Sequence, residues 1–190
     1  MGSKKGALRL YELKLTLMYL EPMVWRRVRV PRDITLAQLH DVIQIAMHWE
    51  NDHLHEFVIG RKRYGIPMPD PIGFGDPPVD EGIVHLNGVA KPKAKFVYLY
   101  DFGDDWTHEI RVERELESES GKRGAICVAG ENACPPEDCG GVPGYLAMLD
   151  ILADAEHEEY GEMREWLGDD FDPRHFDADQ TNKRLRRLKV

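Results

Sequence analysis

The pattern of apolar and polar positions begins with a strict alternation near the N-terminus. Every second position from 11 to 19 is apolar or aromatic, while Glu12, Lys14 and Thr16 lie on the other face. This period of two predicts a half-buried β-strand. The segment MVWRRVRVP at 23–31 resumes the alternation after Pro22 and ends at a proline, so the two segments predict a β-hairpin. The expected core faces are Tyr11, Leu13, Leu15, Leu17 and Tyr19 on the first strand, and Val24, Val28 and Val30 on the second.

A helical period follows from about 36 to 49. Thr35 is a suitable N-cap, and Gln38 stands where the side chain of a capping box reaches back to the cap. Ile34 and Leu39 occupy the positions of a hydrophobic staple. The apolar residues expected to face the core are Leu36, Leu39, Ile43, Ala46 and Met47.

More strands are expected in the middle of the chain. HLHEFVIG at 53–60 predicts a third strand with His53 and His55 on one face. Residues 61–92 are rich in proline and glycine, which disfavour regular structure, so we expect a long excursion with a short strand near 83–86. KFVYLYDF at 95–102 is apolar on both faces, as in a central strand, and WTHEIRVERE after it predicts a hairpin partner.

The C-terminal part is expected to be helical over 143–190. Residues 117–124 predict a flexible connection, followed by two short amphipathic helices and a last helix from about Ala178, capped by Asp177. The order of elements predicts an α+β fold in a single domain spanning 1–190, with a mixed or antiparallel sheet. Its strand–strand–helix–strand start is β-grasp-like, and the C-terminal helices are expected to pack at one edge.

Length and composition support this interpretation. A chain of 190 residues with 42% hydrophobic and 31% charged residues fits one folded domain, with a flexible N-terminus at 1–7. The absence of a long apolar run argues against a membrane partner and favours a cytoplasmic location. The formal charge of −9 argues against nucleic acid as a partner. The basic segments at 25–30 and 183–189 are expected to be a strand and the solvated face of a helix.

The densest group of special residues is ENACPPEDCGG at 131–141. Cys127, Cys134 and Cys139 are zinc-ligand types, although their spacing is wider than the usual Cys-x(2–4)-Cys hook. A fourth ligand could come from His108, His53 or His55. The alternative is a rigid turn, in which two prolines stiffen the approach, Glu137 and Asp138 accept hydrogen bonds from exposed amides, and two glycines adopt special backbone angles.

Two further segments concentrate histidine and aspartate. YDFGDDWTH at 100–108 places Asp101, Asp104, Asp105, Trp106 and His108 at a hairpin tip, where they bind an ion or simply stabilise the turn. HWENDHLHEF at 48–57 supplies a histidine pair on one side of a strand, but it lacks the His-Glu-x-x-His helix of a zinc protease. The residues that we expect to approach one another are His53, His55, Asp101, Asp105 and His108.

Four separated blocks resemble the plasmid pRiA4b ORF-3-like family. They are the segment from LYELKLTL to HLHEF, YLYDFGDDWTHEIRVE, CVAGENACPPEDCGGVPGY and EWLGDDFDPRHFD, in the same order as in the family. The resemblance implies a single α+β domain of bacterial or archaeal origin, with a link to mobile elements and no established catalytic set. The positions that match the family pattern are Pro22, Trp25, Arg26, His53, His55, Phe57, Asp101, Gly103, Asp104, Trp106, His108, Pro135, Pro136, Glu137, Asp138, Gly140, Gly141, Asp172, Pro173 and Phe176.

Three functional hypotheses follow. The first is a non-enzymatic binding or adaptor module for an unknown protein or small ligand, motivated by the absence of a complete catalytic template. Its candidate surface is His53, His55, Asp101, Asp104, Asp105, Trp106 and His108. The second is a metal-dependent hydrolase that uses the histidine and aspartate residues of this cluster. The third is a structural zinc site without catalysis, held by Cys127, Cys134, Cys139 and His108. Zinc is the one cofactor that these hypotheses name.

Overall fold

The computed structural model describes residues 7–68, 77–119 and 121–190. The expected flexible segment at 1–7, apart from Ala7, and part of the expected excursion lie outside these residues. The strands are β1 (Arg9–Leu17), β2 (Trp25–Pro31), β3 (His55–Ile59), β4 (Lys62–Gly65), β5 (Val79–Asp80), β6 (Lys95–Tyr100), β7 (Trp106–Glu117) and β8 (Ile126–Glu131). The helices are α1 (Leu36–Met47), the 3₁₀ turn η1 (Glu81–Ile83), α2 (Leu86–Val89), α3 (Gly141–Ala153), α4 (Tyr160–Leu167) and α5 (Ala178–Leu185).

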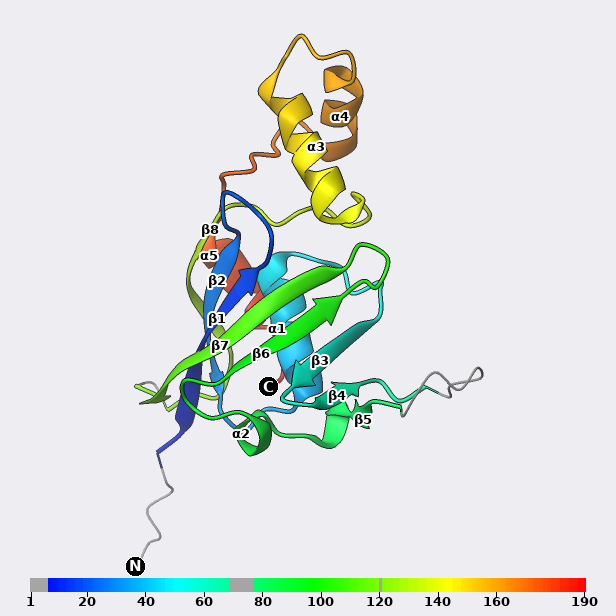
Figure 1. The fold of residues 1–190 in the computed structure, drawn as a ribbon. Coiled ribbons are helices and arrows are strands. Elements are labelled where there is room, and N and C mark those ends of the chain that lie inside the picture. Colours follow the sequence, from blue (N-terminus) through cyan, green and yellow to red (C-terminus); the bar gives the residue numbers. More distant parts are fainter. Residues whose placement is uncertain (1–6, 69–76, 120) are drawn as a thin grey trace, which may run out of the picture.

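One mixed sheet of eight strands organises the molecule, in the order β5-β4-β3-β6-β7-β1-β2-β8 (Figure 1). All neighbouring strands are antiparallel except β4 and β5, which pair in parallel. The expected α+β class and the strand–strand–helix–strand start are therefore confirmed. No helix in the described part of the chain is long and apolar enough to cross a membrane.

Local sequence signals account for the first elements. Tyr11, Leu13, Leu15 and Leu17 alternate into the core and are nearly inaccessible to solvent. Tyr19 was expected on the same face, but β1 ends at Leu17 and Tyr19 lies in the turn with 73% of its surface exposed. Because an apolar face must be covered, this alternation fixes which side of the sheet α1 packs against.

The capping box predicted for α1 is present. The Gln38 amide donates to Thr35 Oγ1 (3.2 Å), and the Thr35 amide donates to Gln38 Oε1 (3.0 Å). The helix ends at Met47, two residues earlier than expected, because His48 adopts a left-handed conformation (φ 66°) and turns the chain away. The C-terminal helices separate into two groups: α3 and α4 pair beyond the β1–β2 turn, while α5 returns to pack against β8 and α1 (Figure 1).

The structure also differs from expectation in the other strands. β3 begins at His55, so His53 belongs to the loop before it. The strand expected near 83–86 is reduced to a single bridge between Thr35 and His85, because η1 and α2 flank it. β4, β5 and β8 are additional strands, and a register shift between Arg27 and Val28 interrupts the pairing of β2 with β8.

Candidate metal centre

The centre is built around His53, in the loop between α1 and β3. Two left-handed residues, His48 and Asn51, turn the chain after the helix and bring His53 over the end of β6. Its ring packs edge-on against Tyr100, with the centroids 5.8 Å apart, and remains partly exposed. Its two ring nitrogens face acidic side chains from other segments.

Asp101 lies on one side of this ring, directly after β6. Its left-handed backbone (φ 56°) begins a tight turn in which the Gly103 amide donates to Asp101 Oδ1 (2.9 Å) and the Asp105 amide donates to the Asp101 carbonyl (2.6 Å). His53 Nδ1 lies 3.7 Å from the same Oδ1. The turn therefore holds a largely buried carboxylate against the imidazole.

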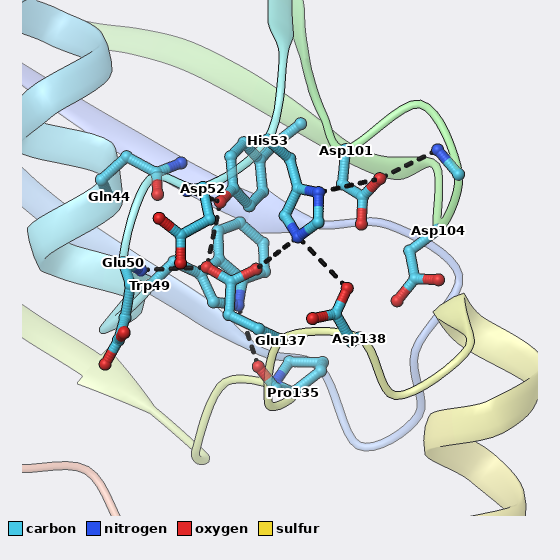
Figure 2. A network of polar contacts seen from close by, with 12 residues as sticks. Gln44, Trp49, Glu50, Asp52, His53, Asp101, Asp104, Pro135, Glu137 and Asp138 are labelled. Carbon is cyan, nitrogen blue, oxygen red and sulfur yellow. Dashed lines mark hydrogen bonds and ion pairs between the residues drawn. The ribbon is translucent and has the colours of Figure 1, made fainter.

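The loop after β8 supplies the other side of the centre. Trp49 Nε1 donates to the Pro135 carbonyl (2.9 Å) and so anchors the loop to the end of α1 (Figure 2). Asp138 Oδ1 lies 3.2 Å from His53 Nε2, and Glu137 Oε2 lies 3.8 Å from the same nitrogen. Figure 2 shows His53 between Asp101 on one side and this acidic pair on the other.

Glu137 is held by one of its two carboxylate oxygens. The Tyr100 hydroxyl and the Glu50 amide both donate to Oε1, each at 2.9 Å. Burial, together with the neighbouring Glu137 carboxylate, raises the pKa of Tyr100, so the phenol stays protonated as a donor. Oε2 is buried and has no hydrogen-bond partner. A buried carboxylate oxygen without a partner is unusual and indicates that it faces a ligand or water.

Three of these residues meet a geometric requirement for metal binding. His53, Asp101 and Asp138 each offer one ligand atom, and these atoms lie within 4.8 Å of one another. Ligand atoms bound to one ion at about 2.1 Å lie roughly 3–3.4 Å apart in cis-octahedral or tetrahedral geometry, so separations of up to 4.8 Å would have to close by up to roughly 1.5 Å. In the described parts of the chain this is the one such group of three or more histidine, cysteine or acidic residues.

The structure corrects the sequence-based site at several residues. His55 does not accompany His53: it is buried, stacks on His40 with the ring centroids 3.5 Å apart, and bonds to Glu81 through Nε2. The physical reason is that β3 begins at His55, so the two histidines do not share a strand face. The expected convergence therefore holds for His53 and Asp101 but not for His55.

Trp106 and His108 were also expected on the candidate surface, and the structure places them elsewhere. Both point from β7 into the core and are fully buried, so neither contributes to a partner surface. Burial lowers the pKa of His108 to about 4, and its Nδ1 contacts the Trp106 carbonyl at 3.1 Å. Asp104 and Asp105 serve the turn instead, where Asp104 Oδ2 accepts from the Gly140 amide (3.2 Å).

The three thiols do not converge as the zinc hypothesis requires. Cys127 belongs to β8 and is buried, whereas Cys134 and Cys139 belong to the following loop. Within the described residues, no group of three candidate ligands includes a thiol. Burial raises the pKa of Cys139 to about 12 and that of Cys134 further, which keeps both thiols protonated. The geometry of the loop agrees with a rigid turn.

Sequence reasoning assigned Glu137 and Asp138 only to that turn. The role expected for Glu137 is present, since it accepts the Glu50 amide. Its position beside His53 was not expected, because the two residues lie far apart in the chain. The available signal was an acidic pair between two prolines and two glycines, a composition that rigidly presents side chains at a loop tip.

Comparison with known proteins gives consistent matches. Over 174 residues the chain is 43% identical to the "Uncharacterized protein y4hQ" of Sinorhizobium fredii (strain NBRC 101917 / NGR234), covering 90% of this chain and 88% of that protein. The crystal structure of the protein of unknown function MM3350 from Methanosarcina mazei Go1 superposes with a TM-score of 0.80 at 42% identity, covering 90% of this chain and 96% of that one. The model of the family described as "Plasmid pRiA4b ORF-3-like protein" matches residues 9–180, and the chain therefore belongs to the plasmid pRiA4b ORF-3-like family.

Proposed function

We propose that the protein binds a divalent transition-metal ion through His53, Asp101 and Asp138. The observation that carries the proposal is the convergence of one imidazole and two carboxylates from three segments that are distant in sequence. Two carboxylates beside one partly exposed imidazole give a local negative field that favours a cation. A metal ion would neutralise this charge and fix the three loops together.

The donor set indicates which ions fit. One nitrogen and two carboxylate oxygens suit Mn²⁺ or Zn²⁺, because imidazole is a common ligand of both metals. Ca²⁺ takes six to eight oxygen ligands, more than this group provides. The sites left open by three protein ligands would be filled by water or by a bound molecule.

Calorimetric titration of chelator-treated protein with Mn²⁺ or Zn²⁺ tests the proposal. We expect one ion per chain, with affinity at least about tenfold lower in His53→Ala and in Asp138→Asn. His157→Ala is the matched control, since this histidine lies in the loop between α3 and α4. Absence of stoichiometric binding, or equal affinity in His53→Ala and His157→Ala, would refute the site.

Metal-dependent hydrolysis is a second candidate, favoured by Glu137 Oε2. This buried, unpartnered oxygen lies 3.8 Å from His53 Nε2, close enough to accept a proton from a water beside the ion. Glu137→Gln is expected to abolish hydrolysis of p-nitrophenyl ester or phosphate substrates while Mn²⁺ affinity changes less than about threefold. Turnover unchanged in this variant, or no turnover in metal-loaded wild type across both substrate classes, would argue against this candidate.

The adaptor hypothesis must use other residues. His55, Asp101, Trp106 and His108 are buried, so the accessible part of the expected surface consists of His53, Asp104 and Asp105. The comparisons concern proteins of unknown function and name no partner. A protein partner and a link to mobile elements remain predictions, to be tested by co-purification with wild type and His53→Ala protein.

A further inference from the structure

A pocket of about 580 Å³ lies beside the candidate metal centre. Its walls are the end of α1 with the loop after it, the loop after β8, and the segment that joins α4 to α5. Glu137 and Asp138 border both sites, whereas His53 and Asp101 do not line the pocket. This volume lies within the range of small-molecule binding sites.

The lining is strongly acidic. Among its described residues there is one arginine and no lysine, against seven carboxylates: Glu50, Asp52, Glu137, Asp138, Asp170, Asp172 and Asp177. These carboxylates come from both sides of the pocket, since three belong to the segment between α4 and α5. A concave surface of one charge sign concentrates the field and attracts ions of the opposite sign.

Arg26 does not offset this field at the pocket surface. Its side chain is buried, and its guanidinium donates to the backbone carbonyls of Ala46 (3.0 Å), Trp25 (2.8 Å) and Glu131 (2.8 Å). The ring of Phe176 covers it, with the guanidinium carbon 4.0 Å from the ring centroid. The Arg26 guanidinium is therefore engaged by backbone carbonyls and by Phe176, which argues against an anionic ligand in the pocket.

Several pocket carboxylates have no side-chain partner among the residues that the structure describes. The side chains of Glu50, Asp52 and Asp170 make no hydrogen bond or ion pair with the described residues. Glu137, whose buried Oε2 has no hydrogen-bond partner among the described residues, lines the same pocket. Positively charged donors would satisfy these oxygens, while a neutral apolar ligand would remove water from them without replacement.

Aromatic side chains accompany the carboxylates. Trp166, Phe171 and Phe176 line the pocket, and Trp166 leaves 53% of its surface exposed on α4, a helix with no buried residue. Exposed aromatic faces among carboxylates are typical of sites for ammonium and guanidinium groups, which gain both charge and cation–π contacts. A bare metal ion would leave the exposed Trp166 ring and most of the volume without contacts.

We propose that this pocket binds an organic cation carrying two ammonium or guanidinium groups, one near Glu50 and Glu137 and the other near Asp170. This chemistry occurs in free polyamines and in the arginine and lysine side chains of peptides. The inference goes beyond metal binding and does not require an ion at His53.

Calorimetry at low ionic strength with 4-aminobutylguanidine, spermidine and a capped Arg-Gly-Arg peptide, each of which carries at least two cationic groups, tests the proposal. Glutarate, an anion of similar length, is the ligand control. We expect the cations to bind and glutarate not to bind, with affinity falling as salt is added. Tighter binding of the peptide would assign the cation to a protein partner, and tighter binding of the free amines would assign it to a polyamine.

Three variants separate this pocket from the metal centre. Trp166→Ala is expected to weaken cation binding about fivefold, while Tyr19→Ala, an exposed aromatic outside the pocket, leaves it unchanged. His53→Ala should lose Mn²⁺ affinity yet retain cation binding within about twofold. The proposal is overturned if no cation binds more tightly than glutarate, or if Trp166→Ala and Tyr19→Ala behave alike.

Discussion

Replacing Gly141 with alanine is expected to destabilise the contact between the start of α3 and the turn at 101–105. Gly141 adopts φ +66°, and a Cβ at this position would lie 2.5 Å from the Asp104 carbonyl oxygen. A left-handed conformation costs a non-glycine residue about 1–2 kcal/mol. Overpacking against backbone adds about 1–3 kcal/mol. The expected loss in the free energy of unfolding is therefore about 2–5 kcal/mol.

Urea denaturation measures this loss, and Gly161→Ala provides the matched control. Gly161 lies in α4, where a Cβ would meet no atom of another element within 4 Å, so alanine there is expected to stabilise the protein by about 0.5–1 kcal/mol. Because Asp104 and Asp101 share one turn, Gly141→Ala is also expected to weaken Mn²⁺ binding. An unchanged urea midpoint in Gly141→Ala, or shifts of the same sign in both variants, would refute the reasoning.

Two further predictions concern buried titratable groups. Burial lowers the pKa of His108 to about 4, so its contribution to stability is complete above about pH 6.5 and is lost as pH falls towards 4, where the unfolded chain binds the proton more readily. Between pH 7 and pH 4, the free energy of unfolding of wild type should therefore fall on the order of 3 kcal/mol further than that of His108→Phe. Urea titrations at both pH values measure this difference, and identical pH profiles would contradict the prediction. Since burial raises the pKa of Cys134 and Cys139, iodoacetamide at pH 7.5 should alkylate the native thiols roughly a hundredfold or more slowly than the unfolded ones, whereas equal rates would show that they are accessible.

Local patterns in the sequence were sufficient for much of the fold. The alternation from Tyr11 to Leu17, the capping box at Thr35 and the cap at Asp177 depend on neighbouring residues, and each is present. β8 was not predicted, because Gly130 and the pairing shift opposite Arg27 interrupt its alternation. Residue propensity and hydrophobic periodicity indicate a strand only when its pattern is regular, so an irregular edge strand is difficult to predict from them.

The candidate site was harder to predict because long-range packing assembles it. His53 and Asp101 were expected to meet, since β3 and β6 were expected to share the sheet, and these strands do pair. Nothing local indicates that the loop carrying Asp138 docks on Trp49 and reaches His53. The same limit explains Arg26, which lies on the apolar face of β2 because backbone carbonyls and Phe176 accommodate its charge.

The position of β1 between β2 and β7 has a consequence for synthesis on the ribosome. β2 follows β1 at once, but β7 begins at Trp106, 89 residues after β1 ends at Leu17. At about 5–20 residues per second, the free edge of β1 waits roughly 5–20 s for its second partner. During that interval the nascent hairpin presents unpaired backbone groups that another chain can occupy, which makes this edge the expected point of misassembly and of chaperone recognition.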